Sequence, residues 1–411
     1  MKKLFISIAA LGLINAGAYA DVTRDIATLK ADLHTYQEMT DTLIDEISDL
    51  KSGFSYMVVD DSESHHGMGS AASKVYYSKS PLSIGGYGEM YWANPDNGDN
   101  FADVYRFIPY IGYRFSDNII LNTEIEFEHG GESVVIEFLY LDFLINAHTN
   151  IRLGNLLVPM GLINLRHEPT LFNTIQRPEL ERYLIPSTWH ENGLLVYGMI
   201  AESDFEYTVG LVNALDLKAG NEASPTQWIR KGRIGSRNKG VMNRVAVVGR
   251  LDYRGYHGAL IGVSAYYGDA AQGAVSGSSA LMYDVHATYE TRGMKAKGVF
   301  TATSITGAKE WNLPDAATKA QGYYLNIEYD LLHTAATSLR LPLFVQYESY
   351  DPTKKTLGTR QRSNAVTNMT FGVNVFPHEQ VVLKVDYTMK NYDDDNQKDY
   401  HTLSLGLGFI F

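Results

Sequence analysis

The sequence predicts an all-β fold: a 16-stranded antiparallel transmembrane β-barrel, preceded by a periplasmic coiled-coil helix. Three observations lead to this prediction. The last residues alternate between apolar and small or polar side chains and end on Phe411. The amino terminus reads as an export signal, and the 411 residues include no cysteine. Strand-like segments recur from Leu82 onward, and period-two alternation gives each strand one face for lipid and one for water.

Residues 1–20 are predicted to be a secretory signal peptide. Two lysines precede an apolar run from Leu4 to about Leu13, and a small-x-small cleavage site ends at Ala20. The run is too short to span a membrane. We therefore expect an exported chain that begins at Asp21.

Composition and charge restrict the class of protein further. An exported chain without disulfides needs another source of stability, and a closed barrel supplies it through an unbroken hydrogen-bond ladder. The 28 tyrosines suit membrane interfaces, where the ring is buried and the hydroxyl stays wet. A formal net charge of -12 argues against a general nucleic-acid binder.

Residues 21–51 read as a coiled-coil helix. Apolar positions recur at alternating spacings of four and three, with charged and polar residues between them. These positions are Val22, Ile26, Leu29, Leu33, Tyr36, Thr40, Leu43, Ile47 and Leu50. Such a narrow stripe favours self-association, although a single amphipathic helix lying on the barrel would also show a stripe.

Residues 52–81 lose this periodicity and are predicted to form a flexible linker, because they are rich in Gly, Ser and Asp. His65 and His66 lie near acidic residues there, but their spacing matches no defined metal site. We expect neither a metal nor another cofactor in this chain.

Residues 82–411 are predicted to form the barrel. The clearest hairpin joins 104–115 to 119–128 through a tight turn at 116–118. Fourteen further strands are expected near 84–92, 134–145, 150–157, 193–200, 205–212, 244–253, 259–268, 281–291, 295–304, 321–330, 340–349, 366–376, 380–391 and 400–411. Sixteen strands leave an aqueous channel, whereas eight would be filled by side chains.

One segment carries a resemblance to a known family. It reads IRLGNLLVPMGLIN from Ile151 to Asn164 and continues with HEP at His167, RP at Arg177 and IPSTW from Ile185. In these residues the chain resembles the phosphate-selective porin O/P family. The resemblance implies a trimeric sixteen-stranded porin in which a long loop after the fifth strand folds inward and narrows the pore. The N-terminal coil resembles that of dicarboxylate-type trimeric porins.

The candidate constriction loop is 157–192. A loop of this length within a compact fold is usually functional, and charges of both signs across a narrow pore select solutes by charge and size. The predicted constriction residues are Arg166, His167, Glu168, Arg177, Glu181 and Arg182. The alternative is an extracellular loop that covers a trimer contact.

Other charged residues are predicted to line the lumen or its mouth. The candidate lumen residues are Arg106, Arg114, Glu124, Glu126, Arg152 and Arg250. A basic run could funnel anions by raising their local concentration, could bind lipopolysaccharide phosphates, or could be a solvated loop; it comprises Arg230, Lys231, Arg233 and Arg237. A lumen with both signs of charge does not establish phosphate specificity.

These features predict a porin in the outer membrane of a Gram-negative bacterium, through which small hydrophilic solutes diffuse passively, with anion preference as one option. The expected partners are outer-membrane lipid and lipopolysaccharide, small ions or solutes and two further copies in a homotrimer, but no nucleic acid. The alternative is a structural anchor that tethers the envelope through the coiled coil. No enzyme is predicted, because Ser187, His190 and Glu191 are close in sequence without an orienting context.

Overall fold

The computed structural model describes residues 24–47, 64–359 and 363–411, which belong to two compact units, 1–55 and 56–411. The predicted signal peptide and the first part of the predicted linker, 52–63, lie outside the described residues. Within the described residues, no helix is both long and apolar enough to cross a membrane.

In the first unit the described residues form a helix over 24–47, which confirms the predicted N-terminal helix. Every residue of this helix is exposed, including the apolar positions of the heptad pattern: Ile26, Leu29, Leu33, Tyr36, Leu43 and Ile47. A helix with an uncovered apolar stripe gains little from packing on its own. Its self-association stays a prediction.

The second unit is a closed antiparallel barrel of sixteen strands, as predicted. Consecutive strands pair with one another, and β1 pairs with β16 to close the wall. The strands are β1 (Leu82–Pro95), β2 (Phe101–Ser116), β3 (Ile119–Glu128), β4 (Ser133–Asn146), β5 (Thr149–Leu157), β6 (His190–Met199), β7 (Phe205–Asn213), β8 (Val245–Tyr253), β9 (Ala259–Asp269), β10 (Ser279–Thr291), β11 (Met294–Thr306), β12 (Ala317–Asp330), β13 (Pro342–Thr356), β14 (Val366–His378), β15 (Val381–Tyr392) and β16 (Tyr400–Ile410). Closure leaves no free sheet edge.

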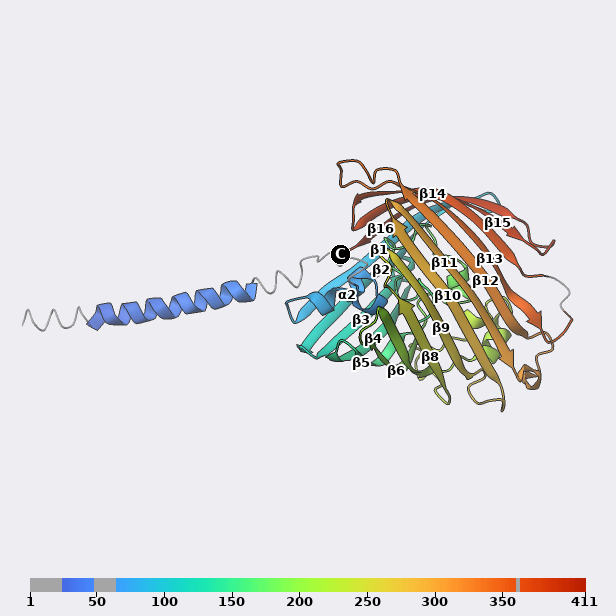
Figure 1. Ribbon diagram of the computed structural model, residues 1–411, viewed down its shortest axis with the longest axis horizontal. Coiled ribbons are helices and arrows are strands. Elements are labelled where there is room, and N and C mark those ends of the chain that lie inside the picture. Colours follow the sequence, from blue (N-terminus) through green and yellow to red (C-terminus); the bar gives the residue numbers. More distant parts are fainter. Residues whose placement is uncertain (1–23, 48–63, 360–362) are drawn as a thin grey trace, which may run out of the picture. The chain divides into compact units, whose positions relative to one another are not determined.

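Side chains alternate between the outer and inner faces of this wall. In β16, Leu403 and Leu405 are exposed on the outside, whereas Ser404 between them is buried inside. In β12, Leu325 and Ile327 are likewise exposed on the outside. Figure 1 shows how the neighbouring strands run side by side along the wall. Exposed apolar side chains around a closed wall form the surface that a lipid bilayer covers.

The connections differ between the two ends of the barrel. At one end, the short-turn end, the strands are joined by segments such as 117–118, 147–148 and 292–293. At the other end lie the long loops 158–189 and 214–244. This asymmetry is typical of outer-membrane barrels, in which the turns are periplasmic and the long loops are extracellular.

The structure differs from the predicted linker at residues 64–81. Here the chain forms η1 (His65–Gly67) and α2 (Ser70–Tyr77), and α2 lies against β1, β2 and β3 inside the barrel (Figure 1). The side-chain amide of Asn122 in β3 donates to the carbonyl of Ala72 at 2.9 Å. Eight residues are too few for a helical period to be visible in the sequence. Burial among inward-facing side chains therefore orders a segment that reads as flexible.

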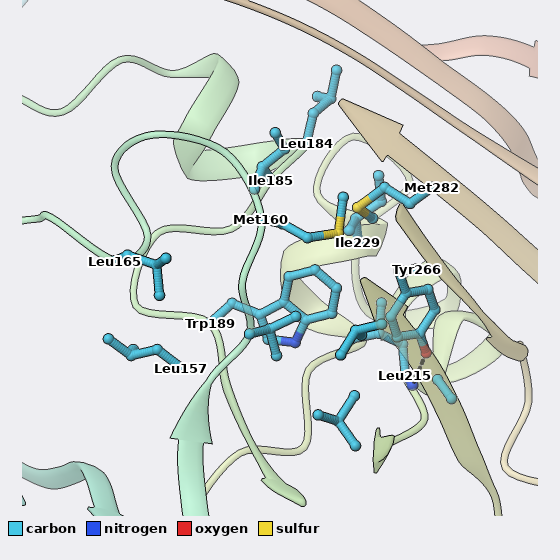
Figure 2. Close-up of a cluster of buried hydrophobic side chains, with 14 of the residues drawn as sticks. Leu157, Met160, Leu165, Leu184, Ile185, Trp189, Leu215, Ile229, Tyr266 and Met282 are labelled. Atoms are coloured by element: carbon cyan, nitrogen blue, oxygen red, sulfur yellow. Dashed lines mark hydrogen bonds between the residues drawn. The ribbon is translucent and has the colours of Figure 1, made fainter. Parts of the chain in front are cut away.

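The apolar core lies inside the barrel, where two long loops meet the wall. These loops carry α3 (Leu180–Tyr183), α4 (Leu217–Ala223) and α5 (Trp228–Lys231); η2 (His129–Gly131) and η3 (Ala308–Trp311) lie in other connections. Figure 2 shows Trp189 and Met160 of the first loop among Leu215 and Ile229 of the second. Trp189 packs on Tyr266 of β9 with ring centroids 5.4 Å apart. The lumen of this barrel is therefore partly filled by its own loops.

Candidate pore constriction and lumen

The segment 158–189 between β5 and β6 folds into the barrel and is called the inward loop below. Its backbone bonds to side chains that the strands point inward. The Gly161 N–H donates to Asp284 of β10 at 3.1 Å, and the Ile175 N–H donates to Asp386 of β15 at 2.7 Å. Four strands lie between β10 and β15 around the wall, so the loop is held from well-separated parts of the barrel.

Glu181 fixes the fold of the inward loop. Its carboxylate accepts hydrogen bonds from the N–H groups of Leu162 (2.8 Å) and Ile163 (2.7 Å) and from the Tyr324 hydroxyl of β12 (2.7 Å). Burial raises the pKa of Glu181 to about 7, and these hydrogen bonds oppose part of the rise. This predicted constriction residue is therefore a buried anchor and does not border open space.

Glu168 joins the inward loop to α2. Its Oε1 accepts hydrogen bonds from the N–H groups of Ala71 (3.0 Å) and Ala72 (3.1 Å), in the first turn of the helix. A carboxylate at this position satisfies free donors and favours the helix dipole. The inward loop and α2 are therefore connected inside the lumen, and together they are called the filling of the barrel below.

His167 and Arg177 are buried together. The Nε2 atom of His167 is 3.0 Å from Glu124 Oε1 and 4.0 Å from Glu137 Oε2. Burial, with a contribution from the Arg177 charge, lowers the pKa of His167 to about 3. Arg177 donates to the Tyr87 hydroxyl and to the His167 carbonyl, both at 3.0 Å. Arg177 thus holds the loop against β1.

Arg166 borders a cavity of about 540 Å³ at the short-turn end of the barrel. The other charged or titratable residues of its lining are Arg254, Tyr256, His257, Glu290, Lys295 and Lys297. Basic groups predominate in this lining. Arg182, the last of the predicted constriction residues, is half-buried and lies over the Tyr183 ring, with its guanidinium carbon 5.6 Å from the ring centroid.

The predicted lumen residues point inward but are engaged in ion pairs and hydrogen bonds. Arg106 lies 2.9 Å from Glu89, 2.8 Å from Glu126 and 3.3 Å from Glu128. These four side chains come from β1, β2 and β3, so one guanidinium is shared by three carboxylates within the wall. A buried guanidinium retains its charge only with such partners.

The remaining lumen arginines contact the filling of the barrel. Arg152 pairs with Asp142 at 2.9 Å and donates to the Tyr76 hydroxyl of α2 at 3.3 Å. Arg250 pairs with Asp252 at 2.8 Å and donates to the Gly161 carbonyl of the inward loop. Arg114 donates to the Ser78 carbonyl just after α2 at 3.0 Å. Side chains predicted to face open water therefore hold α2 and the inward loop in place.

The basic run from Arg230 to Arg237 divides into two pairs. Arg230 donates to the Arg182 carbonyl at 3.2 Å, and Arg233 donates to the Ser187 carbonyl at 3.1 Å. Burial and repulsion from Arg233 lower the pKa of Arg230 to about 9. Lys231 and Arg237 are exposed. Two of these cations therefore join the two long loops, and two face solvent.

Sequence reasoning missed one ion pair that helps to position the loop. Glu179 lies 2.7 Å from Lys390 of β15 and accepts a hydrogen bond from Tyr350 of β13 at 2.7 Å. Burial opposes ionisation of Glu179, but the Lys390 charge prevails and lowers its pKa below the ordinary value. The only signal in the sequence was the inward position of Lys390 in an alternating strand.

Comparisons with solved structures support the architecture. The chain is similar to OmpF of Salmonella typhi in complex with daunomycin, with 13% identity, a TM-score of 0.54, and 80% of this chain and 97% of that chain covered. It is similar to the outer membrane channel DcaP of Acinetobacter baumannii at 13% identity and a TM-score of 0.52, with the same coverage. A loop-deletion mutant of OmpT, an outer membrane protein of Vibrio cholerae, matches at 10% identity with a TM-score of 0.52, covering 80% of this chain and 99% of that chain.

At these identities the similarity shows a shared fold. No family model matches the sequence. A closed sixteen-stranded wall with an apolar outer face places the chain in the outer membrane of a Gram-negative bacterium, as predicted. An uncharacterized protein of Aquifex aeolicus (strain VF5) is 32% identical over 366 residues, which cover 82% of each chain. The chain therefore belongs to the same family as this Aquifex aeolicus protein.

Proposed function

We propose that the protein is a porin through which small hydrophilic solutes diffuse passively. The observation that carries the proposal is a closed wall of sixteen strands with a long loop folded inside it. Barrels of this size enclose an aqueous channel. In such a barrel, loops held by side-chain contacts set the width of the path. The cavity of about 540 Å³ beside Arg166 supports the proposal, because it opens space at the short-turn end of the barrel.

We further propose that the channel prefers anions. The cavity lining contains Arg166, Arg254, Lys295 and Lys297, with Glu290 as its acidic residue. Arg254 pairs with Glu206 at 3.0 Å and Lys295 pairs with Glu290 at 3.1 Å, so the lining and these partners contain four basic and two acidic side chains. Excess positive charge at a narrow entrance raises the local concentration of anions. The resemblance to phosphate-selective porins agrees with this preference but does not identify the solute.

The test is planar-bilayer recording of the purified protein across a KCl gradient. We expect discrete steps of current as single channels open. The sign of the reversal potential should be the one that chloride permeation produces. Arg166→Gln should shift the reversal potential toward zero. The control is Lys398→Gln, which removes an exposed charge from the connection between β15 and β16 at the opposite end of the barrel and should leave the reversal potential unchanged. A barrel without open steps would favour the anchor alternative. A cation-selective reversal potential would contradict the anion preference.

We propose a homotrimer and assign no enzymatic activity. The exposed apolar stripe of helix 24–47 supports association through the helix.

The cluster of Ser187, His190 and Glu191 is not arranged for catalysis. Glu191 accepts hydrogen bonds from the N–H groups of Ile234 and Gly235, both at 3.0 Å, while His190 bonds the Thr188 carbonyl. A triad would need the carboxylate to orient the imidazole.

A further inference from the structure

Three electron-pair donors from separate elements converge inside the barrel. Glu124 of β3, Glu137 of β4 and His167 of the inward loop are 0%, 2% and 2% exposed. One side-chain donor atom from each lies within 4.8 Å of the other two. Two ligands of a tetrahedral metal are about 3.4 Å apart when each is about 2.1 Å from the ion. The separations from His167 Nε2 to the carboxylates, 3.0 and 4.0 Å, are on either side of that value.

The hydrogen bonding of His167 determines its tautomer, and therefore which ring nitrogen has a lone pair directed at the carboxylates. Its Nδ1 is 3.0 Å from the Asn164 carbonyl oxygen. A carbonyl oxygen can only accept, so Nδ1 carries the hydrogen. In the neutral ring Nε2 then presents a lone pair toward Glu124 Oε1. Two acceptors at 3.0 Å repel each other unless a proton or a cation lies between them.

Two carboxylate oxygens of the cluster lack a hydrogen-bond donor among the described residues, and one of them is the Glu137 oxygen that lies 4.0 Å from His167. The Oε2 atoms of Glu124 and Glu137 are buried and accept no hydrogen bond from the described residues. No hydrogen bond joins these two oxygens to the neighbouring cations. Arg106 is engaged with Glu89, Glu126 and Glu128. Arg177 donates through Nη2 to Tyr87 and to the His167 carbonyl, while its buried Nε and Nη1 have no hydrogen-bond partner among the described residues. Buried carboxylates without donors are costly unless they are neutralised.

We propose that Glu124, Glu137 and His167 bind one divalent transition-metal ion. Two carboxylates and one imidazole form a mixed oxygen and nitrogen donor set, which suits Zn²⁺ and Mn²⁺. The bond from Nδ1 to a backbone carbonyl is the usual support of a metal-bound histidine, because it fixes the tautomer and the ring orientation. The ion would link the inward loop to two strands of the wall. This site does not depend on whether the barrel conducts.

The test is metal binding by the full-length protein, purified in detergent without a histidine tag and stripped with a chelator. Titration with Zn²⁺, followed by elemental analysis after gel filtration, should give about one ion per chain. Glu137→Gln and His167→Gln should each weaken binding at least about 100-fold, because each removes a ligand. Glu348→Gln, at a carboxylate that is buried in another part of the wall, should bind Zn²⁺ as the unaltered protein does.

Co²⁺ gives a second readout, since a bound ion with this donor set has a visible absorption band that Glu137→Gln should remove. Glu137→Gln preserves shape, so it carries the test if His167→Gln fails to fold. The proposal is overturned if the unaltered protein binds neither Zn²⁺ nor Mn²⁺ with a Kd below about 10 µM. Equal binding by Glu137→Gln and the unaltered protein also overturns it. In either case a shared proton or a buried water bridges the cluster.

Discussion

The anchor role of Glu181 predicts that its removal opens the channel without unfolding the barrel. Glu181→Ala leaves the N–H groups of Leu162 and Ile163 and the Tyr324 hydroxyl without their acceptor. A buried donor that loses its partner costs about 1–3 kcal/mol. Three such donors therefore cost about 3–6 kcal/mol, allowing for entry of a water molecule. About 1.4 kcal/mol changes an equilibrium constant tenfold. The equilibrium between the inward and the displaced position of the loop therefore shifts at least a hundredfold toward the displaced position.

Single-channel recording at pH 6 measures this shift. Glu181→Ala should show a larger conductance or frequent steps to a wider state. Glu181→Gln is the matched control, since its amide oxygen can still accept from the two N–H groups, and it should conduct as the unaltered protein does. Circular dichroism and heat-modifiable migration on gels should show an intact barrel in both variants. Unchanged conductance in Glu181→Ala would refute the assignment of Glu181 as the anchor.

The same residue predicts a pH dependence. The pKa of Glu181 in the folded protein, about 7, lies above its ordinary value of 4.5 because of burial, with the nearby Asp284 charge adding to the rise. The folded state therefore binds more protons between these values, and stability falls as pH rises from about 4.5 through about 7, by up to about 3 kcal/mol. Wider openings should become more frequent at pH 8 than at pH 5. Glu181→Gln has no such group, so a pH response of the same size in this variant would contradict the explanation.

Three further predictions concern the loop, the wall and the helix. Gly161→Ala should loosen the inward loop by at least about 1 kcal/mol and widen the channel, since Gly161 has φ +70° and a Cβ there would lie 2.3 Å from the Glu181 carboxylate. Leu405→Arg on the outer face should destabilise the barrel by about 2–4 kcal/mol in urea unfolding, whereas Leu331→Arg in an exposed turn should cost less. Leu33→Asp should lower the oligomeric mass in analytical ultracentrifugation if helix 24–47 self-associates, and an unchanged mass would exclude that role.

The wall could be predicted from sequence because its physics is local. The predicted strand 119–128 coincides with β3, and 400–411 differs from β16 by one residue. Alternation shows which side chains meet lipid, since each strand has only two faces. The hairpin turn near 117–118 follows from its Ser-Asp-Asn sequence. Each of these signals lies within about a dozen residues, so no knowledge of distant partners is needed.

The filling of the barrel could not be predicted because its partners are far apart in the chain. The sequence identified His167 and Glu181 as charged groups of one long loop. It did not indicate that His167 meets Glu124, 43 residues earlier, or that Glu181 meets Tyr324, 143 residues later. Helix α2 was missed for the same reason, because Glu168 caps it from the inward loop. From sequence, the opposite charges of the lumen predict an electric field across a water-filled pore. In the structure, most of these side chains form ion pairs or hydrogen bonds with one another or with the loop.

The wall and its filling have different sources of stability, and this difference bears on how the channel can open. The wall is held by a continuous ladder of backbone hydrogen bonds that closes between β1 and β16. The filling is held by separate contacts, such as Glu181 with the loop backbone and Lys390 with Glu179. Each such contact is worth about 1–3 kcal/mol. Losing one or two therefore displaces the inward loop long before the wall separates. Changes in solute size or selectivity should accordingly arise from substitutions at loop contacts, while the strands stay as they are.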